Sequence, residues 1–150
     1  MEHHRAEEIM SAIESRLATL SAKGIKALRG RSFPGDGSAL PRVNVYQGSD
    51  RPVEKGVNNL ALIDRELEVR VDAYVDAAPE QLDAALNQIR REVYVAMMAE
   101  QNMTLPFIQI VMWKGDGAPE VPDPEAHPSV GRVAMSFAVR YRHSHGNPSA

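Results

Sequence analysis

The sequence predicts a single α+β domain over residues 1–150, in which a mainly antiparallel four-stranded sheet is covered by two amphipathic helices. Apolar and polar residues alternate from Glu66 to Val75, as they do in a strand with one buried face. A stripe of apolar residues at helical spacing then follows between Pro79 and Met97. The length of 150 residues suits one domain, and the predicted order of elements is α-β-β-α-β-β.

The N-terminal region predicts a helix over residues 6–22, because apolar residues recur there every three or four positions, at Ile9, Ile13, Leu17 and Leu20. Gly24 is a typical helix end. We expect a loop from Gly24 to Leu40, since residues 32–38 are dense in turn-forming residues. This region also carries a concentrated basic cluster, formed by Lys23, Lys26, Arg29 and Arg31.

A short strand is expected over Pro41–Gln47, where apolar and polar residues alternate. Pro41 suits the start of such a strand, because proline lacks the N–H that an interior position donates to the ladder. The polar stretch Gly48–Asn59 then predicts a long loop or a hairpin arm, with charged residues at Arg51, Glu54 and Lys55.

The second half of the chain predicts a helix and two further strands. Pro79 suits the first position of a helix, and its apolar stripe consists of Leu82, Leu86, Ile89, Val93 and Met97. Strands are expected over residues 104–113 and 132–142. The segment between them is rich in proline and is therefore neither a helix nor a central strand. Residues 143–150 are expected to form a loose tail.

The composition excludes several classes of protein. The chain has no cysteine, which excludes a disulfide scaffold and a thiolate zinc site. Its formal net charge of -3 argues against a general nucleic-acid binder. The N-terminus lacks the apolar core of a signal peptide, and no run approaches the ~20 apolar residues of a membrane span. We expect a protein of the cytoplasm, or of an assembly made there, with no membrane partner.

No arrangement of residues predicts catalysis. The sequence contains no HExxH, no GxSxG and no phosphate-binding glycine loop followed by lysine. His143 and His145 fit a polar tail better than a metal site. Carboxylates at Glu66 and Glu68 suit a hard cation, but Arg70 beside them favours a charge-balanced surface. We therefore expect no catalytic residue, no metal and no cofactor, and a scaffold or binding domain in place of an enzyme.

Two surfaces are candidate contacts. Mixed charges can fix the register between subunits, so we predict a subunit or partner contact at the polar face of the central strand and at the arm: Glu66, Glu68, Arg70, Asp72, Tyr74, Arg51, Glu54 and Lys55. The basic cluster is a candidate contact for DNA or for an acidic neck protein, through Lys23, Lys26, Arg29 and Arg31. The alternative for both sets is a solvated surface without a partner.

The segment Pro41-Arg42-Val43-Asn44-Val45-Tyr46 is similar to the Pro-x-Val-x-Val-Tyr strand of the tail terminator proteins (tail completion proteins, minor tail protein U-like) of lambda-like long-tailed phages. In that family a polar arm, a long strand like that from Arg65, and a proline-started helix like that from Pro79 come next. A final strand like residues 133–141 ends the pattern. The resemblance covers nearly the whole chain. The proline-rich insert Ala118–Pro128 departs from the family pattern.

The resemblance implies a structural protein without catalytic residues. Such a protein forms a homo-hexameric ring on the head-proximal end of the tail tube in the virion, where it ends tube polymerisation and provides the head-joining surface. The implied partners are further copies of the chain, the major tail tube protein, and a neck or head-completion protein. Genome DNA passes through the lumen without specific binding, which suits the mild negative charge.

Two alternatives stay open. One is another connector of the head–tail neck, such as a stopper protein, which shares the size and the ring symmetry. The other is a small ligand-binding or enzymatic α+β domain, which would show a concave pocket with converging polar groups.

Overall fold

The computed structural model describes residues 2–31, 40–100 and 102–150, so the turn-rich stretch predicted at residues 32–38 lies outside the described residues. The elements, in chain order, are α1 (Arg5–Ala18), the 3₁₀ helix η1 (Thr19–Lys23), β1 (Lys26–Arg29), β2 (Arg42–Pro52), β3 (Leu62–Asp76), the 3₁₀ helix η2 (Pro79–Gln81), α2 (Leu82–Met98), β4 (Ile108–Asp116) and β5 (Val130–Ser144).

The sheet has five strands in the order β1-β2-β3-β5-β4 and is mixed, because β1 and β2 run parallel. The predicted four-stranded sheet and the order α-β-β-α-β-β were therefore wrong: the observed order is α-β-β-β-α-β-β. The missed strand is Lys26–Arg29, which we expected to be loop. It has one partly buried apolar residue, Ala27, and its ladder partners come from β2. Such non-local pairing leaves no alternating pattern in the sequence.

Strands β3 and β5 form the centre of the sheet. Each has 15 residues, and they pair without a register shift from Leu62 opposite Ser144 to Asp76 opposite Val130. The alternation that predicted the central strand is confirmed, since its apolar members are buried on one face: Leu67, Val69, Val71, Ala73 and Val75. The strand extends beyond the predicted residues at both ends.

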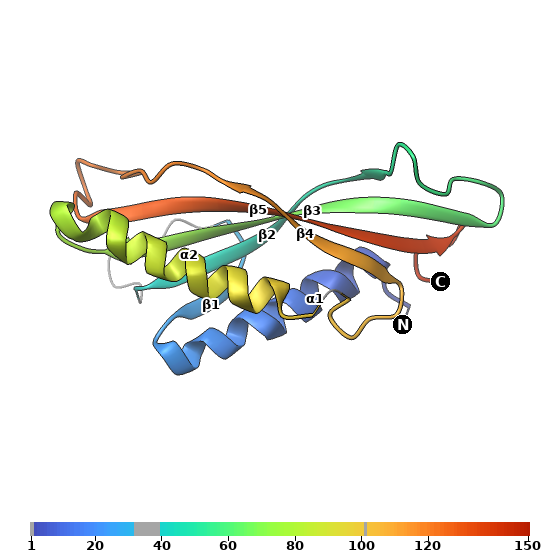
Figure 1. Ribbon diagram of the computed structural model, residues 1–150, viewed down its shortest axis with the longest axis horizontal. Coiled ribbons are helices and arrows are strands. Elements are labelled where there is room, and N and C mark those ends of the chain that lie inside the picture. The colour runs from blue at the N-terminus through green and yellow to red at the C-terminus, as the bar shows by residue number, and fades with distance from the viewer. Residues whose placement is uncertain (1, 32–39, 101) are drawn as a thin grey trace.

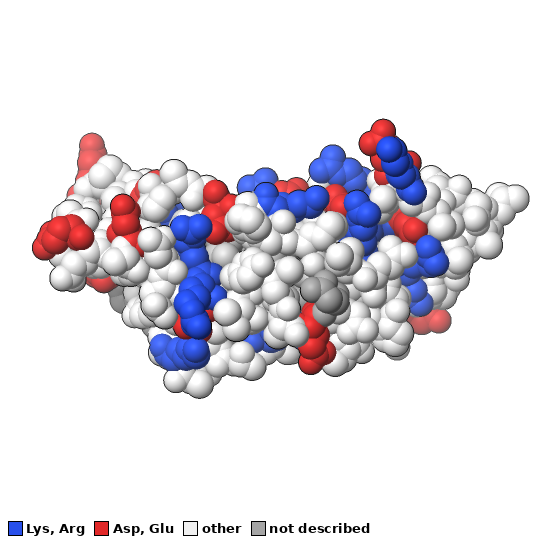
Figure 2. Space-filling view, viewed as in Figure 1, with Lys and Arg blue, Asp and Glu red and all other residues white. Residues whose placement is uncertain are grey.

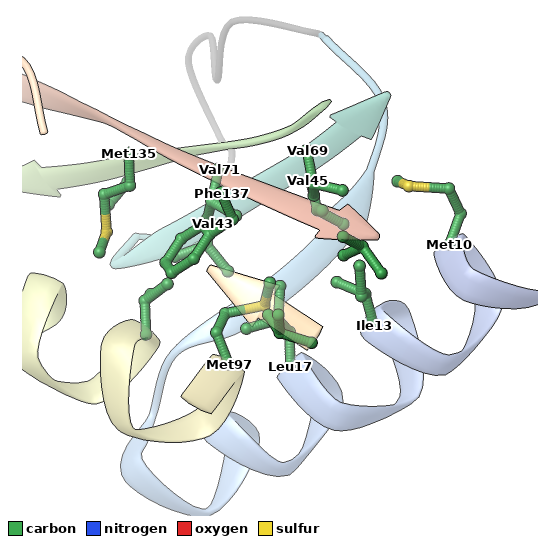
Figure 3. Packing of buried hydrophobic residues seen from close by; sticks show 14 of the residues in the cluster. Met10, Ile13, Leu17, Val43, Val45, Val69, Val71, Met97, Met135 and Phe137 are labelled. Atoms are coloured by element: carbon green, nitrogen blue, oxygen red, sulfur yellow. The ribbon is translucent and has the colours of Figure 1, made fainter. Parts of the chain in front are cut away.

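Both helices lie on the same side of the elongated sheet, below it in Figure 1. The apolar stripes predicted for the two helices are buried against the sheet at Ile9, Ile13, Leu17, Leu86, Ile89, Val93 and Met97. Figure 3 shows side chains from the helices and the strands meeting in this core, among them Leu17, Met97, Val71 and Phe137. One face of the sheet thus carries the core, and none of the helices in the described residues lies on the opposite, helix-free face.

The C-terminal residues are packed against the domain and do not form the loose tail that we expected for residues 143–150. Strand β5 continues to Ser144, and the His143 side chain is buried. The His145 N–H donates to the Ala61 carbonyl at 2.9 Å, and the Arg5 N–H donates to the Pro148 carbonyl at 2.9 Å. These long-range hydrogen bonds hold both ends of the chain at one end of the sheet.

Candidate functional site

The polar face predicted on β3, here called the ladder, consists of Glu66, Glu68, Arg70, Asp72 and Tyr74. Its first half, from Glu66 to Arg70, is accessible to solvent on the helix-free face of the sheet. Arg70 is exposed, and its Nε donates to Glu68 Oε1 at 2.7 Å. Arg140 Nε on the neighbouring strand donates to Glu66 Oε1 at 3.2 Å. Because water screens such exposed pairs, each stabilises the fold by only about 0–1 kcal/mol. These charges are therefore available to a partner at little loss of stability.

The second half of the ladder is buried. Asp72 is 6% exposed and Tyr74 is 2% exposed. The Tyr46 hydroxyl donates to Asp72 Oδ2 at 3.2 Å, and burial raises the pKa of the Asp72 carboxyl. Arg132 lies opposite Tyr74 on β5 and forms an ion pair with Glu120 of the proline-rich segment. The predicted ladder is thus divided between an open and a buried part, and its role as a contact stays a prediction.

The polar arm begins as the end of β2 and turns back into β3. Its base is held by Asp64, which accepts hydrogen bonds from Arg142 Nε at 2.6 Å, from the Val57 N–H at 2.9 Å and from Gln109 Nε2 at 3.2 Å. The bond from Arg142 lowers the pKa of the Asp64 carboxyl. At the tip, Leu60 is 90% exposed. The predicted contact residues of the arm are all exposed: Arg51, Glu54 and Lys55.

A second carboxylate, the partly buried Asp50, lies where the arm leaves the core. Tyr141 is fully buried, and its hydroxyl donates to Asp50 Oδ2 at 2.6 Å, while Arg65 Nε donates to Asp50 Oδ1 at 3.1 Å. Burial, followed by the bond to Asp50, raises the pKa of the Tyr141 phenol. The sequence did not predict this cluster, because an irregularity after Gln47 shifts the register and brings Asp50 opposite Leu67.

The predicted basic cluster is spread over η1, which holds Lys23, over β1, which holds Lys26 and Arg29, and over the stretch after β1, which holds Arg31. Lys23 Nζ lies 2.6 Å from Glu92 Oε2 on α2. Arg29 binds Glu7 on α1 through both terminal nitrogens, at 2.5 and 2.8 Å. These ion pairs lower the pKa of both carboxyls. Two of the four cations are therefore balanced within the chain.

The remaining two cations of that cluster lie near β2. Arg31 Nη2 donates to the Gln47 carbonyl at 2.8 Å, and its guanidinium lies 5.0 Å from the centre of the Tyr46 ring. Lys26 is exposed at the start of β1. The contact of these four side chains with DNA or a neck protein stays a prediction.

An open groove between α2 and β4 was not predicted. It has a volume of about 410 Å³, and its apolar wall consists of Tyr94, Val95 and Trp113, which are 43%, 53% and 47% exposed. The two rings meet edge to face with their centres 6.2 Å apart. Asp116 accepts from Trp113 Nε1 at 2.8 Å and from Arg90 Nε at 2.9 Å. Figure 2 shows Lys and Arg side chains beside the region of α2. The sequence does indicate part of this groove, because Tyr94 and Val95 are apolar residues of α2 that lie outside its buried apolar stripe.

The polar clusters chiefly connect strands and anchor the arm. Within residues 2–31, 40–100 and 102–150, no three His, Cys, Asp or Glu side chains are grouped as a metal site requires. No helix in those same ranges is long and apolar enough to span a membrane. What these residues arrange is a set of surfaces: the open ladder, the arm and the groove.

Comparison with known proteins identifies a fold and no family. The sequence matches no protein-family model and no curated protein. Among solved structures, it is similar to a chain of the virion of a native gene transfer agent (GTA) particle, with a TM-score of 0.53 and 15% identity over 89% of this chain and 93% of that chain. A second solved chain aligns over 91% of this chain and 94% of its own length, with 13% identity and a TM-score of 0.49. The chain therefore shares its fold with a component of a gene transfer agent virion.

Proposed function

We propose that this chain is a structural subunit of a phage-like virion and that it acts as a tail terminator. In this role, a hexameric ring of the chain sits on the head-proximal end of the tail tube, ends polymerisation of the tube protein and presents the surface that joins the head. The observation that carries the proposal is the fold shared with a chain of a gene transfer agent virion over 89% of the sequence. The resemblance of the strand at Pro41–Tyr46 to tail terminators supports the more specific role.

The exposed surfaces suit ring formation. A closed ring is built from heterologous contacts, in which one face of a subunit meets a different face of the next. The arm extends to one end of the long axis in Figure 1, and its base is fixed through Asp64. Burying an exposed leucine such as Leu60 in a partner stabilises a contact by about 1.5–3 kcal/mol. The open ladder of Glu66, Glu68 and Arg70 offers charges that fix the register.

We propose that the role is mechanical and involves no catalysis. The buried Asp64 and the partly buried Asp50 are each bonded to an arginine and to groups on neighbouring strands, which suits a stiff sheet. The pairing of Lys23 and Arg29 with acidic residues of the chain limits attraction to phosphate groups. Because this attraction is limited, genome DNA would slide through a lumen built from copies of the chain.

Two measurements test this function. Native mass spectrometry and negative-stain microscopy of the purified full chain should show closed hexameric rings. Cryo-electron microscopy of phage-like particles that carry a tagged copy should place the tag directly on the last ring of the tail tube. A tag one layer nearer the head would indicate a neck connector, and a chain that stays monomeric and is absent from particles would contradict the proposal.

A further inference from the structure

The proline-rich segment Gly117–Ser129 between β4 and β5 has no part in the function proposed above. It contains four prolines and no lysine or arginine, and its acidic residues are Glu120, Asp123 and Glu125. In Figure 1 it runs along the sheet towards the end of the molecule where α2 begins. A surface segment of one charge sign is suited to a partner of the opposite sign.

Hydrogen bonds tie the start of this segment to β5 and close a turn near its end. The Gly117 N–H donates to the Ala134 carbonyl at 2.8 Å, which continues the contact of β4 with β5. Further along, the His127 N–H donates to the Asp123 carbonyl at 2.8 Å, and Asp123 Oδ1 accepts from the Ala126 N–H at 3.2 Å. This turn presents Glu125 to solvent. Because these hydrogen bonds restrict the backbone around Glu125, binding through this side chain loses less conformational entropy than binding through a chain without them.

The groove between α2 and β4 has the complementary chemistry. Its rim carries Arg91, whose side chain is 65% exposed and donates to Glu92 Oε1 at 2.9 Å. Arg90 also lines the groove, but it is bonded to Asp116 and its side chain is 36% exposed, so Arg91 is the more exposed cation of this rim. Grooves lined by aromatic rings bind proline-rich segments, because the flat rings pack against the pyrrolidine rings. An acidic segment with prolines on both sides of its charge fits this surface.

We propose that the turn around Glu125 of one copy docks in the groove of a second copy, with Glu125 facing Arg91 and the neighbouring prolines against Tyr94 and Trp113. Within one chain the segment is held beside β5 by its backbone hydrogen bonds, while the groove lies between α2 and β4. The two surfaces are different parts of the molecule, as a heterologous contact requires. This inference rests on the proposed ring, because it identifies one of the contacts that build it.

Trp113 is the single tryptophan of the chain and lies in the groove, so its fluorescence reports occupation of the groove. We expect the emission maximum of the full chain to shift with protein concentration, in parallel with assembly measured by native mass spectrometry. Arg91→Glu and Glu125→Lys should each raise the concentration of half-assembly by about tenfold or more, since each places like charges opposite each other. An equimolar mixture of the two variants, and the double variant, should regain assembly. The control is Glu14→Lys on the exposed side of α1, which should assemble like the wild type.

The outcomes distinguish a wrong contact between copies from a wrong proposal of the ring itself. If the wild type assembles and the two variants assemble equally well, the contact is wrong while the ring stands. The contact is also wrong if the mixture of weakened variants fails to recover, or if Leu60→Ser removes the Trp113 shift and Glu125→Lys does not, because the arm then fills the groove. A wild type that stays monomeric contradicts both. Urea unfolding checks each variant, and Arg91→Gln replaces Arg91→Glu if the latter is less stable.

Discussion

At the scale of single residues, the buried polar groups of this protein act as cross-strand connections. Tyr141 on β5 reaches Asp50 on β2, and Arg142 reaches Asp64 on β3. Each hydrogen bond has a charged partner, and such bonds typically stabilise a protein by about 1.5–3 kcal/mol. Because Asp64 is buried and Asp50 is partly buried, loss of one partner leaves a charge without full compensation. These residues therefore fix how the arm joins the core.

Tyr141→Phe should lower the free energy of unfolding by about 1–3 kcal/mol, because it removes the hydroxyl that donates to Asp50 while the ring keeps its packing. Urea unfolding followed by circular dichroism measures the change. Tyr94→Phe removes the hydroxyl of an exposed ring and serves as the matched control, with an expected change within about 0.5 kcal/mol. Equal effects of the two substitutions would show that the bond to Asp50 contributes nothing.

The stability of the protein should depend on Asp64 at acid pH. The bond from Arg142 lowers the pKa of this carboxyl in the folded state, so the unfolded chain takes up a proton more readily. The contribution is fully present above about pH 4, the ordinary pKa of aspartate, and is lost as the pH falls through the lower pKa of the folded state. Asp64→Asn should therefore be less stable than the wild type at pH 7, by about 1–3 kcal/mol. The difference should shrink towards pH 2.

Urea titrations at pH 7, 5, 3 and 2 measure that difference. Asp76→Asn, at the exposed end of β3, is the control and should follow the wild type at every pH. A constant gap between Asp64→Asn and the wild type across this range would mean that the ion pair with Arg142 does not couple folding to proton uptake.

At the scale of elements, the arm packs closely on itself at Gly56. A Cβ added at Gly56 would lie 2.8 Å from the Cβ of Val53 and 2.9 Å from the Cβ of Asp64. Neither atom can move without its backbone, so the arm must open to accommodate a methyl group. The glycine therefore allows the arm to fold back onto the start of β3.

Gly56→Ala should destabilise the arm by about 1–3 kcal/mol and leave the helices intact. Hydrogen exchange at the Val57 and Val53 amides, which bond to Asp64, should accelerate, while exchange in α1 and α2 should not change. Gly117→Ala is the control, since the atoms nearest to a Cβ there are 3.7 Å away or more. Protected arm amides in Gly56→Ala would contradict the close packing.

Sequence periodicity predicted the elements that bury a complete apolar face, and it failed for the others. The helix stripes and the alternation in β3 are repeated contacts with the core, so they leave a pattern. Strand β1 has only Ala27 directed at the core and depends on the backbone of β2. The C-terminal residues are held by hydrogen bonds to Ala61 and from Arg5, which lie far away in sequence. No local pattern encodes such partners.

At the scale of the whole molecule, the candidate surfaces likewise depend on partners that are distant in sequence and that no local pattern encodes. Alternation placed the charges of β3 on the helix-free face, which the structure bears out for Glu66, Glu68 and Arg70. It did not reveal that Asp72 and Tyr74 are buried, because Arg132 and Tyr46 on the neighbouring strands lie against them. The sequence did not predict the groove beside α2, because side chains of α2 and β4 come together there only when the chain folds.

Substitutions at two adjacent residues of β3 test folding and assembly separately. Arg70 is exposed on the helix-free face, whereas Val71 is fully buried against the helices. Val71→Asp should prevent folding, because an uncompensated charge in the core destabilises by several kcal/mol. Arg70→Glu should change the free energy of unfolding by no more than about 0.5–1 kcal/mol, since it removes only the exposed pair with Glu68. If the open ladder is a subunit contact, Arg70→Glu should still raise the concentration of half-assembly by about tenfold.

Urea unfolding and native mass spectrometry of both variants provide the test. A Val71→Asp protein that unfolds cooperatively would mean that the two faces of β3 are exchanged. An Arg70→Glu protein that folds and assembles like the wild type would show that the open ladder faces solvent in the assembly. The arm and the groove would then remain as the candidate contacts of the ring. Loss of assembly at unchanged stability would instead place the ladder in the contact between subunits, because a surface charge that folding does not use can matter only to a partner.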